Sequence, residues 1–174
     1  QTCALPISGQ LALPPDNEFH QVVVSAGYQL ADRTRVTANV AFGRMTQDQA
    51  FLAPTLNAGL AAPSLPRTSL DGRADTLNAT VELNSAVTDR FRVKLEYLRN
   101  ERDDRTPQAV YDWVTTDMFP GSPRTNLPYD FSQDRFRLRA DYRPAAGFKT
   151  SIGYDYDSND RNLQEVESTR ENTV

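Results

Sequence analysis

Cysteine and histidine are nearly absent from this sequence. Its 174 residues include one of each, Cys3 and His20. A lone cysteine cannot form an internal disulfide or a cysteine-based metal cluster, and a lone histidine leaves most acid–base and metal-centred mechanisms without a required member. We therefore expect a protein that is not an enzyme and that carries no catalytic residue, metal ligand or cofactor-binding residue of its own.

Long apolar runs and an excess of basic residues are also missing. No stretch approaches the roughly 20 apolar residues that a membrane-spanning helix needs. The 19 Lys and Arg residues are interleaved with 23 Asp and Glu residues, for a net charge of -4, so no basic patch predicts binding to nucleic acid. A transmembrane β-barrel is not excluded, because only alternate residues of its strands face lipid.

What the sequence does contain is strict alternation of apolar and polar residues. In 90–97 (RFRVKLEY) every odd position is apolar and every even position is charged. A strand with this period of two has one apolar face and one ionic face, whereas a helix would scatter both sets. The pattern predicts β-structure with two chemically different faces.

The alternation recurs in pairs of segments joined by short turns. Three hairpins are predicted, with strands at about 20–30 and 35–43, 76–84 and 90–97, and 135–142 and 148–157. Long connections run from 46 to 70 and from 100 to 133, and a polar segment without a predicted strand begins at Ser158. Within the second connection, 109–114 could form a short helix after Pro107, but the run is too short to predict one. Such an arrangement is typical of outer-membrane barrels, which have short periplasmic turns and long extracellular loops.

Two folds fit this pattern. A soluble antiparallel sheet with one buried and one wet face produces the same alternation. Three features favour the membrane: strands of about ten residues match a tilted membrane crossing, aromatic residues lie toward strand ends, and the opposite face carries charges that need water or counter-charges. We therefore predict an all-β fold, an antiparallel up-and-down transmembrane β-barrel fragment of about six strands in the bacterial outer membrane.

Domain limits follow from the same reasoning. Residues 1–8 resemble a translated sequencing adapter and are excluded from the fold. Residues 9–174 are assigned to part of a single outer-membrane β-barrel domain. Six strands cannot enclose a wide lumen, and open sheet edges in lipid would leave backbone groups unsatisfied at a cost of several kcal/mol each, so further strands are expected outside this sequence.

Each face has a predicted environment. The residues expected to contact outer-membrane lipid are Val22, Val24, Val40, Phe42, Leu83, Phe91, Val93, Leu95, Tyr97, Phe136, Leu138, Tyr142, Ile152 and Tyr154. The residues expected to line the lumen and contact a partner are Arg35, Arg90, Arg92, Lys94, Arg135, Arg137 and Arg139. These cations either meet acidic groups of a molecule inside the lumen or pair across strands with Glu82, Glu96, Asp141 and Asp155. For any single cation we favour the cross-strand pair.

Short motifs occur in order along the chain, mainly at strand ends and loop starts. They are LPPDNEFHQ at 13–21, GRMTQD at 43–48, AFL at 50–52, LPR at 65–67, SLDG at 69–72, NLPY at 126–129, ADYR at 140–143, GYDYD at 153–157 and ENT at 171–173. As a set they resemble the MtrB/PioB family of outer-membrane β-barrels that associate with decahaem cytochromes. The resemblance covers nearly everything after residue 8.

This resemblance implies a function in extracellular electron transfer. Barrels of the family are porin-like sheaths that hold a periplasmic multihaem c-type cytochrome across the membrane, and an outer-surface multihaem cytochrome often docks on the far side. Electrons would pass through the haems, in metal reduction or iron oxidation, while the barrel insulates and positions them. The chain has no Cys-x-x-Cys-His sequence, so the haem would belong to the partner and not to this chain.

Two other functions fit the residues. A general porin would pass small solutes through the same polar lumen. A soluble or surface β-domain used for adhesion would show the same alternation without lipid contact.

Overall fold

The computed structural model of the chain describes residues 13–115 and 121–174. This part of the chain contains strands and connecting segments but no α-helix. It accordingly has no helix long and apolar enough to cross a membrane. The strands are β1 Glu18–Ala31, β2 Thr34–Gln47, β3 Gly72–Ser85, β4 Phe91–Asp104, β5 Val110–Tyr111, β6 Arg124–Thr125, β7 Phe131–Ala145, β8 Phe148–Arg161 and β9 Ser168–Thr173.

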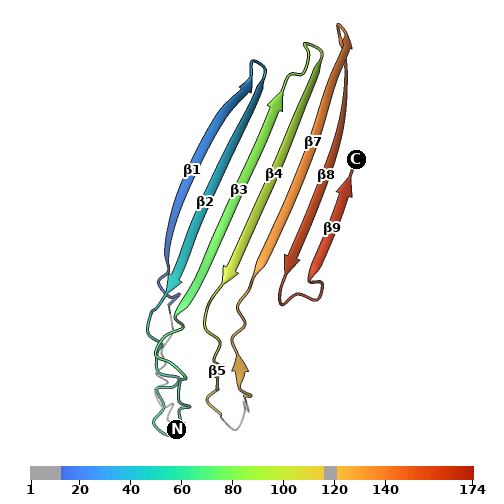
Figure 1. Cartoon of the computed structure of the whole chain (residues 1–174). Helices are drawn as coiled ribbons and strands as arrows, with labels where there is room; N and C mark the ends of the chain where they lie inside the picture. The colour runs from blue at the N-terminus through green and yellow to red at the C-terminus, as the bar shows by residue number, and fades with distance from the viewer. Residues whose placement is uncertain (1–12, 116–120) are drawn as a thin grey trace, which may run out of the picture.

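Seven of these strands form one antiparallel sheet in the order β1-β2-β3-β4-β7-β8-β9. Each long strand lies beside the one that precedes it in the chain, so the sheet is an up-and-down meander (Figure 1). The short turns of the three long hairpins lie at one end of the sheet, the turn end, and the two long loops lie at the other, the loop end (Figure 1). The predicted all-β, up-and-down architecture is confirmed.

The sheet is a single layer without a hydrophobic core. Among the described residues, Ala74 is the only buried hydrophobic residue and Asp75 the only buried charged one. Val22, Val24 and Ile152 expose 67%, 62% and 65% of their surface, although such side chains are normally buried. Within the described ranges no second layer of protein covers them, so this surface requires an apolar environment from outside the sheet.

The register places all fourteen residues predicted to contact lipid on one face of the sheet. Leu83, Leu95, Leu138 and Tyr154 form a continuous row across β3, β4, β7 and β8, and Val36 extends the row onto β2. The other members are even numbers of residues away on paired strands, and they therefore point to the same side. We call this side the apolar face and the opposite side the polar face.

The strands are longer than the alternation predicts. Most contain 14 residues and β7 contains 15, against the expected length of about ten. The additional residues lie mainly at the loop end, where both sides are polar: past Tyr97, β4 continues through Arg99 and Glu101 on the same side. Hydrophobic alternation stops there, but backbone pairing continues and is joined by cross-strand ion pairs such as Arg44–Asp75 at 2.7 Å.

The apolar residues form a belt across the strands, with a step between β3 and β4. Its loop-end limit is Phe42 on β2 and Leu77 on β3, and Leu77 is opposite Glu101 of β4. On β4 the belt ends at Tyr97, four residues nearer the turn end than Glu101. Strands tilted by about 40° and spaced about 4.8 Å apart displace a level plane by roughly one residue per strand. The four-residue step between β3 and β4 is larger than this, and the belt is level on either side of it: Val22, Phe42 and Leu77 share one row, and Tyr97, Phe136 and Tyr156 share another.

The short helix left open at 109–114 does not form. Instead β5 pairs with β6 in a small separate ladder, with Val110 opposite Thr125. A helix of this length cannot offset the cost of its own nucleation. The side chain of Asn126 also binds the backbone of this segment: its Oδ1 accepts from the N–H of Ala109 at 2.7 Å, and its Nδ2 donates to the carbonyl of Pro107 at 3.2 Å. These contacts hold the segment extended.

The prediction that no strand follows residue 158 is also wrong. β8 continues to Arg161, and β9 pairs with its second half, from Asp155 opposite Thr173 to Asp160 opposite Ser168. The sequence of β9, STRENT, is polar on both sides, so hydrophobic alternation cannot reveal it. The expected six strands are therefore one fewer than the main sheet contains.

The turn between β7 and β8 depends on glycine. Gly147 has a φ of +80°, and a Cβ at this position would meet nothing within 4 Å. We expect Gly147→Ala to lower the free energy of unfolding of the intact barrel by about 1 kcal/mol, because of backbone strain alone. Urea titration in lipid vesicles would measure the change.

Gly153→Ala is the matched control for this turn. A Cβ at Gly153 would lie 3.6 Å from the carbonyl oxygen of Leu138, which is ordinary contact. We expect no loss of stability, since glycine is a weak strand former. Equal losses in the two variants would show that the left-handed backbone of Gly147 is not the cause.

Candidate functional site

The polar face carries most of the residues predicted to contact a partner. Arg35, Lys94 and Arg139 share one row across β2, β4 and β7, through Asn84 of β3. The other predicted cations on this face are Arg92, Arg135 and Arg137. These six side chains occupy one surface of about four strand widths.

The seventh predicted cation, Arg90, lies elsewhere. It precedes β4 in the turn, and its guanidinium donates to the carbonyl of Pro144 at 3.2 Å. Alternation places Arg90 in line with Arg92, but the strand begins only at Phe91. Arg90 therefore joins two neighbouring turns at the sheet margin.

Lys94 and Arg137, two of the six cations on the polar face, share one carboxylate, that of Glu96. The Nζ atom of Lys94 lies 3.3 Å from Glu82 on β3 and 3.4 Å from Glu96 on its own strand. The same Glu96 accepts a hydrogen bond from Arg137 on β7 at 3.2 Å. These contacts follow the predicted cross-strand pairing, and they join three strands.

Arg135 is paired as well, with a carboxylate that is not among the four expected cross-strand partners. Its Nε donates to Asp157 on β8 at 2.6 Å. Asp157 also accepts from Gln133 at 3.1 Å and from Asn159 at 2.7 Å. Such a carboxylate has its acceptor capacity largely used within the wall.

Three of the six predicted cations on the polar face have no such partner. Among the described residues, no carboxylate lies within 4.0 Å of Arg35, Arg92 or Arg139. Arg92 is directly opposite Asp141 in the register, but the Asp141 carboxylate binds Lys149 at 3.1 Å. All three arginines are exposed and lie toward the turn end. We call them the turn-end cationic patch.

No metal centre accompanies these charges in the described part of the chain. Within 13–115 and 121–174, no group of three or more His, Cys, Asp or Glu side chains is arranged to hold a metal ion. His20, on the edge strand β1, has its Nε2 3.7 Å from Glu18 and is highly exposed.

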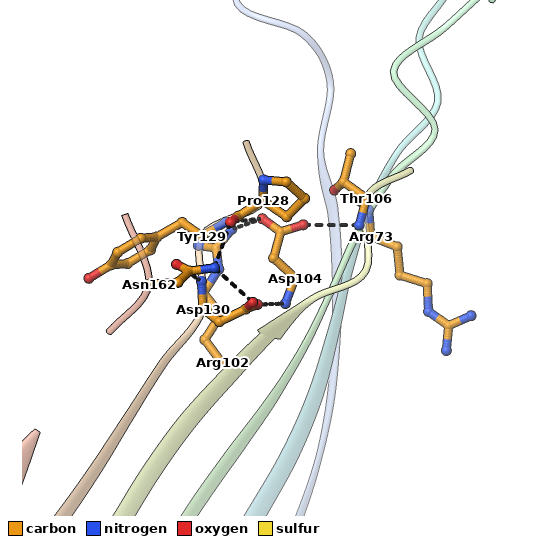
Figure 2. Close-up of polar contacts among 8 residues, drawn as sticks. All are labelled: Arg73, Arg102, Asp104, Thr106, Pro128, Tyr129, Asp130 and Asn162. Atoms are coloured by element: carbon orange, nitrogen blue, oxygen red, sulfur yellow. Dashed lines mark hydrogen bonds and ion pairs between the residues drawn. The ribbon is translucent and has the colours of Figure 1, made fainter. Parts of the chain in front are cut away.

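A second polar arrangement ties the loop-end termini of β4, β7 and β8 together (Figure 2). The backbone N–H of Asp104 donates to Asp130 at 2.6 Å. The Nδ2 of Asn162 donates to the carbonyl of Pro128 and to Asp130, both at 2.9 Å. The N–H of Thr106 donates to the Asp104 carboxylate at 3.1 Å. We call these residues the loop-end network.

Asp104 lies seven residues beyond Tyr97, where the apolar belt of β4 ends. Burial raises the pKa of its carboxyl, but hydrogen bonds from Thr106, Arg102 and the backbone of Tyr129 outweigh burial and lower the pKa below its usual value. Its contribution to stability is therefore complete above the unfolded pKa of about 3.9 and is lost as the pH falls through the lower folded value.

The two long loops also contact each other, which the sequence analysis did not anticipate. The rings of Phe51 and Tyr111 meet edge to face, with centroids 5.8 Å apart and planes at 88°. The first loop is closed on itself by a bridge between Ala50 and Ser69 and by a hydrogen bond from the N–H of Phe51 to the carbonyl of Thr68 at 2.8 Å. No local sequence signal identifies an aromatic contact between distant loops.

These observations define a class of protein. A single-layer antiparallel sheet of 14-residue strands, apolar on one side and ionic on the other, is the wall of an outer-membrane β-barrel. A family model described as outer membrane beta-barrel porin, MtrB/PioB, matches residues 4–174. A relative named Outer membrane protein MtrB, from Shewanella baltica (strain OS185), is 36% identical over 168 residues, which are 96% of this chain and 23% of the relative.

The chain therefore belongs to the MtrB/PioB family of porin-like outer-membrane β-barrels. It spans 23% of the length of the curated relative it matches. The predicted family, barrel class and outer-membrane location are confirmed. The contacts assigned to individual lipid-facing and lumen-facing residues stay predictions, as do the domain limits, and residues 1–8 lie outside the described residues.

Proposed function

We propose that the intact protein is a sheath that holds a periplasmic multihaem c-type cytochrome across the outer membrane for extracellular electron transfer, with an outer-surface multihaem cytochrome as a further partner. The observation that carries this proposal is the turn-end cationic patch, three exposed guanidinium groups on the polar face with no carboxylate within 4.0 Å among the described residues. A wall that lines only water does not require guanidinium groups without carboxylate partners. A protein occupant with acidic groups would use them for position and register.

The chain's own contribution to electron transfer would be structural. Its apolar face would contact lipid and its polar face would surround the occupant, so that lipid is excluded from the electron path. The haems of the partner would carry the electrons, and no residue of this chain would bind them covalently, since it lacks a Cys-x-x-Cys-His sequence. We accordingly propose no enzymatic activity for this chain.

Purification of the intact gene product from its host tests the proposal. We expect a haem-staining protein to remain with the barrel in detergent, and a host strain without the barrel to lose reduction or oxidation of extracellular metal. A barrel that repeatedly purifies without any haem protein would contradict the sheath function.

A general porin is the second candidate, and the description of the matched family as a porin favours it. The polar face would then line an open water path. The two candidates differ in planar bilayers: the protein as isolated should conduct ions poorly if the lumen is filled, whereas an open porin gives a large and steady conductance.

A further inference from the structure

The turn-end cationic patch borders a hollow in the polar face. The hollow measures about 600 Å³, and the charged side chains that line it are Arg33, Arg35, Arg92, Lys94, Arg139 and Asp141. Five cations thus surround one carboxylate. Arg33 is paired with Asp89 and Lys94 with two glutamates, so the remaining positive charge belongs to the patch itself.

A smaller hollow adjoins it over Gly153. This one measures about 250 Å³ and is shared by Lys94 and Arg139, with Arg137, Glu96 and Asp155 on its far side. Gly153 of β8 is directly opposite Arg139 of β7. Because Gly153 has no side chain, space for an inserted group remains beside the Arg139 guanidinium.

The spacing of the patch indicates a surface and not a single small anion. Arg35 and Arg139 occupy the same row but are three strand steps apart, which corresponds to about 14 Å. One carboxylate cannot reach both groups. Guanidinium groups bind carboxylates in a bidentate manner, so each arginine fits a separate acidic group.

We propose that the turn-end cationic patch and the hollow over Gly153 form the seat for a carboxylate-rich surface of the protein that fills the lumen. This inference rests on the proposed sheath function and adds to it the position and chemistry of the contact. The contact lies toward the turn end of the wall. Lys94, Arg135 and Arg137 stabilise the wall itself and do not belong to the seat.

The test uses the full-length barrel expressed in its host with the native cytochrome. One variant combines Arg35→Glu, Arg92→Glu and Arg139→Glu, and a second combines the same positions changed to Gln. The control combines Arg124→Glu and Arg170→Glu, two exposed arginines outside the seat. The measured quantity is the haem retained per folded barrel after washing, with folding verified by heat-modifiable migration in gels.

We expect the Glu variant to retain at least about tenfold less haem protein than the wild type, because three favourable contacts become repulsive. The Gln variant should fall between them, and the control should match the wild type. Washing the wild type in about 1 M salt, where the screening length is near 3 Å, should reproduce part of the loss. Unchanged retention in both patch variants would overturn the inference and show that small mobile anions alone neutralise the patch.

Gly153→Val provides an independent readout that does not depend on charge. Its Cβ has ordinary contacts and valine favours strands, so the barrel should still fold. We expect lower haem retention because the added side chain fills the hollow, and full retention would exclude the hollow from the seat. A wild-type barrel that carries no haem protein would contradict the sheath function itself, which separates the two failures.

Discussion

Leu95→Arg should lower the free energy of unfolding of the intact barrel by about 2–4 kcal/mol, the cost of a charge near the midplane of a bilayer. Leu95 lies in the middle of the belt, in one row with Leu83 and Leu138. Its side chain would contact hydrocarbon in the barrel, where a guanidinium has no counter-charge. The measurement is reversible urea unfolding in lipid vesicles.

Leu98→Arg is the matched control for this substitution. Leu98 is on the same strand but on the polar face, opposite Thr80 and Arg135. The new guanidinium would be hydrated, and its proximity to the paired Arg135 should cost less than about 1 kcal/mol. If Leu98→Arg were the more damaging change, the two faces would be assigned the wrong way round.

Asp104→Ala should open the loop end of the barrel. The substitution removes the acceptor for the N–H of Thr106, the acceptor for the N–H of Tyr129 and the ion pair with Arg102 at 3.2 Å. These donors are only partly buried, so we expect a cost of about 1–2 kcal/mol, at the lower end of the range for unpaired buried groups. We expect trypsin to cleave after Arg105 roughly five to thirty times faster, because cleavage follows the population of the opened state.

Asp112→Ala is the control for the network. Asp112 lies in the same loop, but among the described residues its carboxylate accepts only a local bond from the N–H of Trp113 at 2.8 Å. Its removal should leave the cleavage rate nearly unchanged. Because the pKa of Asp104 is lowered, wild-type protection should persist above about pH 4 and fade only at more acidic pH. Equal cleavage of both variants would show that the network does not close the loop end.

The sequence predicted the part of the fold in which the two faces differ in polarity. Between Phe91 and Tyr97 apolar side chains lie on one face and charged side chains on the other. The pattern therefore identifies the strand, its hairpin partner and the face of each residue. Toward the loop end the same strand continues to Asp104 with polar residues on both sides, and the pattern carries no information there. The strand ends and β9 were missed for this one reason.

The sequence predicted most of the cations that lie on the polar face, but not which of them are paired with carboxylates. Alternation placed Arg35, Arg92 and Arg139 beside Lys94, and it could not tell which of them would be paired. That distinction depends on the register, which brings Lys94 within reach of Glu82 and leaves Arg92 opposite a carboxylate already bound to Lys149. The register between strands that long loops connect is set by the tertiary structure, and the alternation in one sequence does not determine it.

The strands continue beyond the apolar belt and extend the barrel wall at its loop end. From Tyr97, where the apolar belt of β4 ends, to Asp104 the strand covers about 18 Å along the barrel axis, at about 3.3 Å per residue and a tilt of about 40°. Ion pairs on its outer side, such as Arg99 with Asp134 at 2.8 Å, suit the polar headgroup layer and not the acyl chains. If the proposed sheath function holds, we expect the protein in the lumen to be enclosed by the wall over this height and to be accessible from outside only at the loop end.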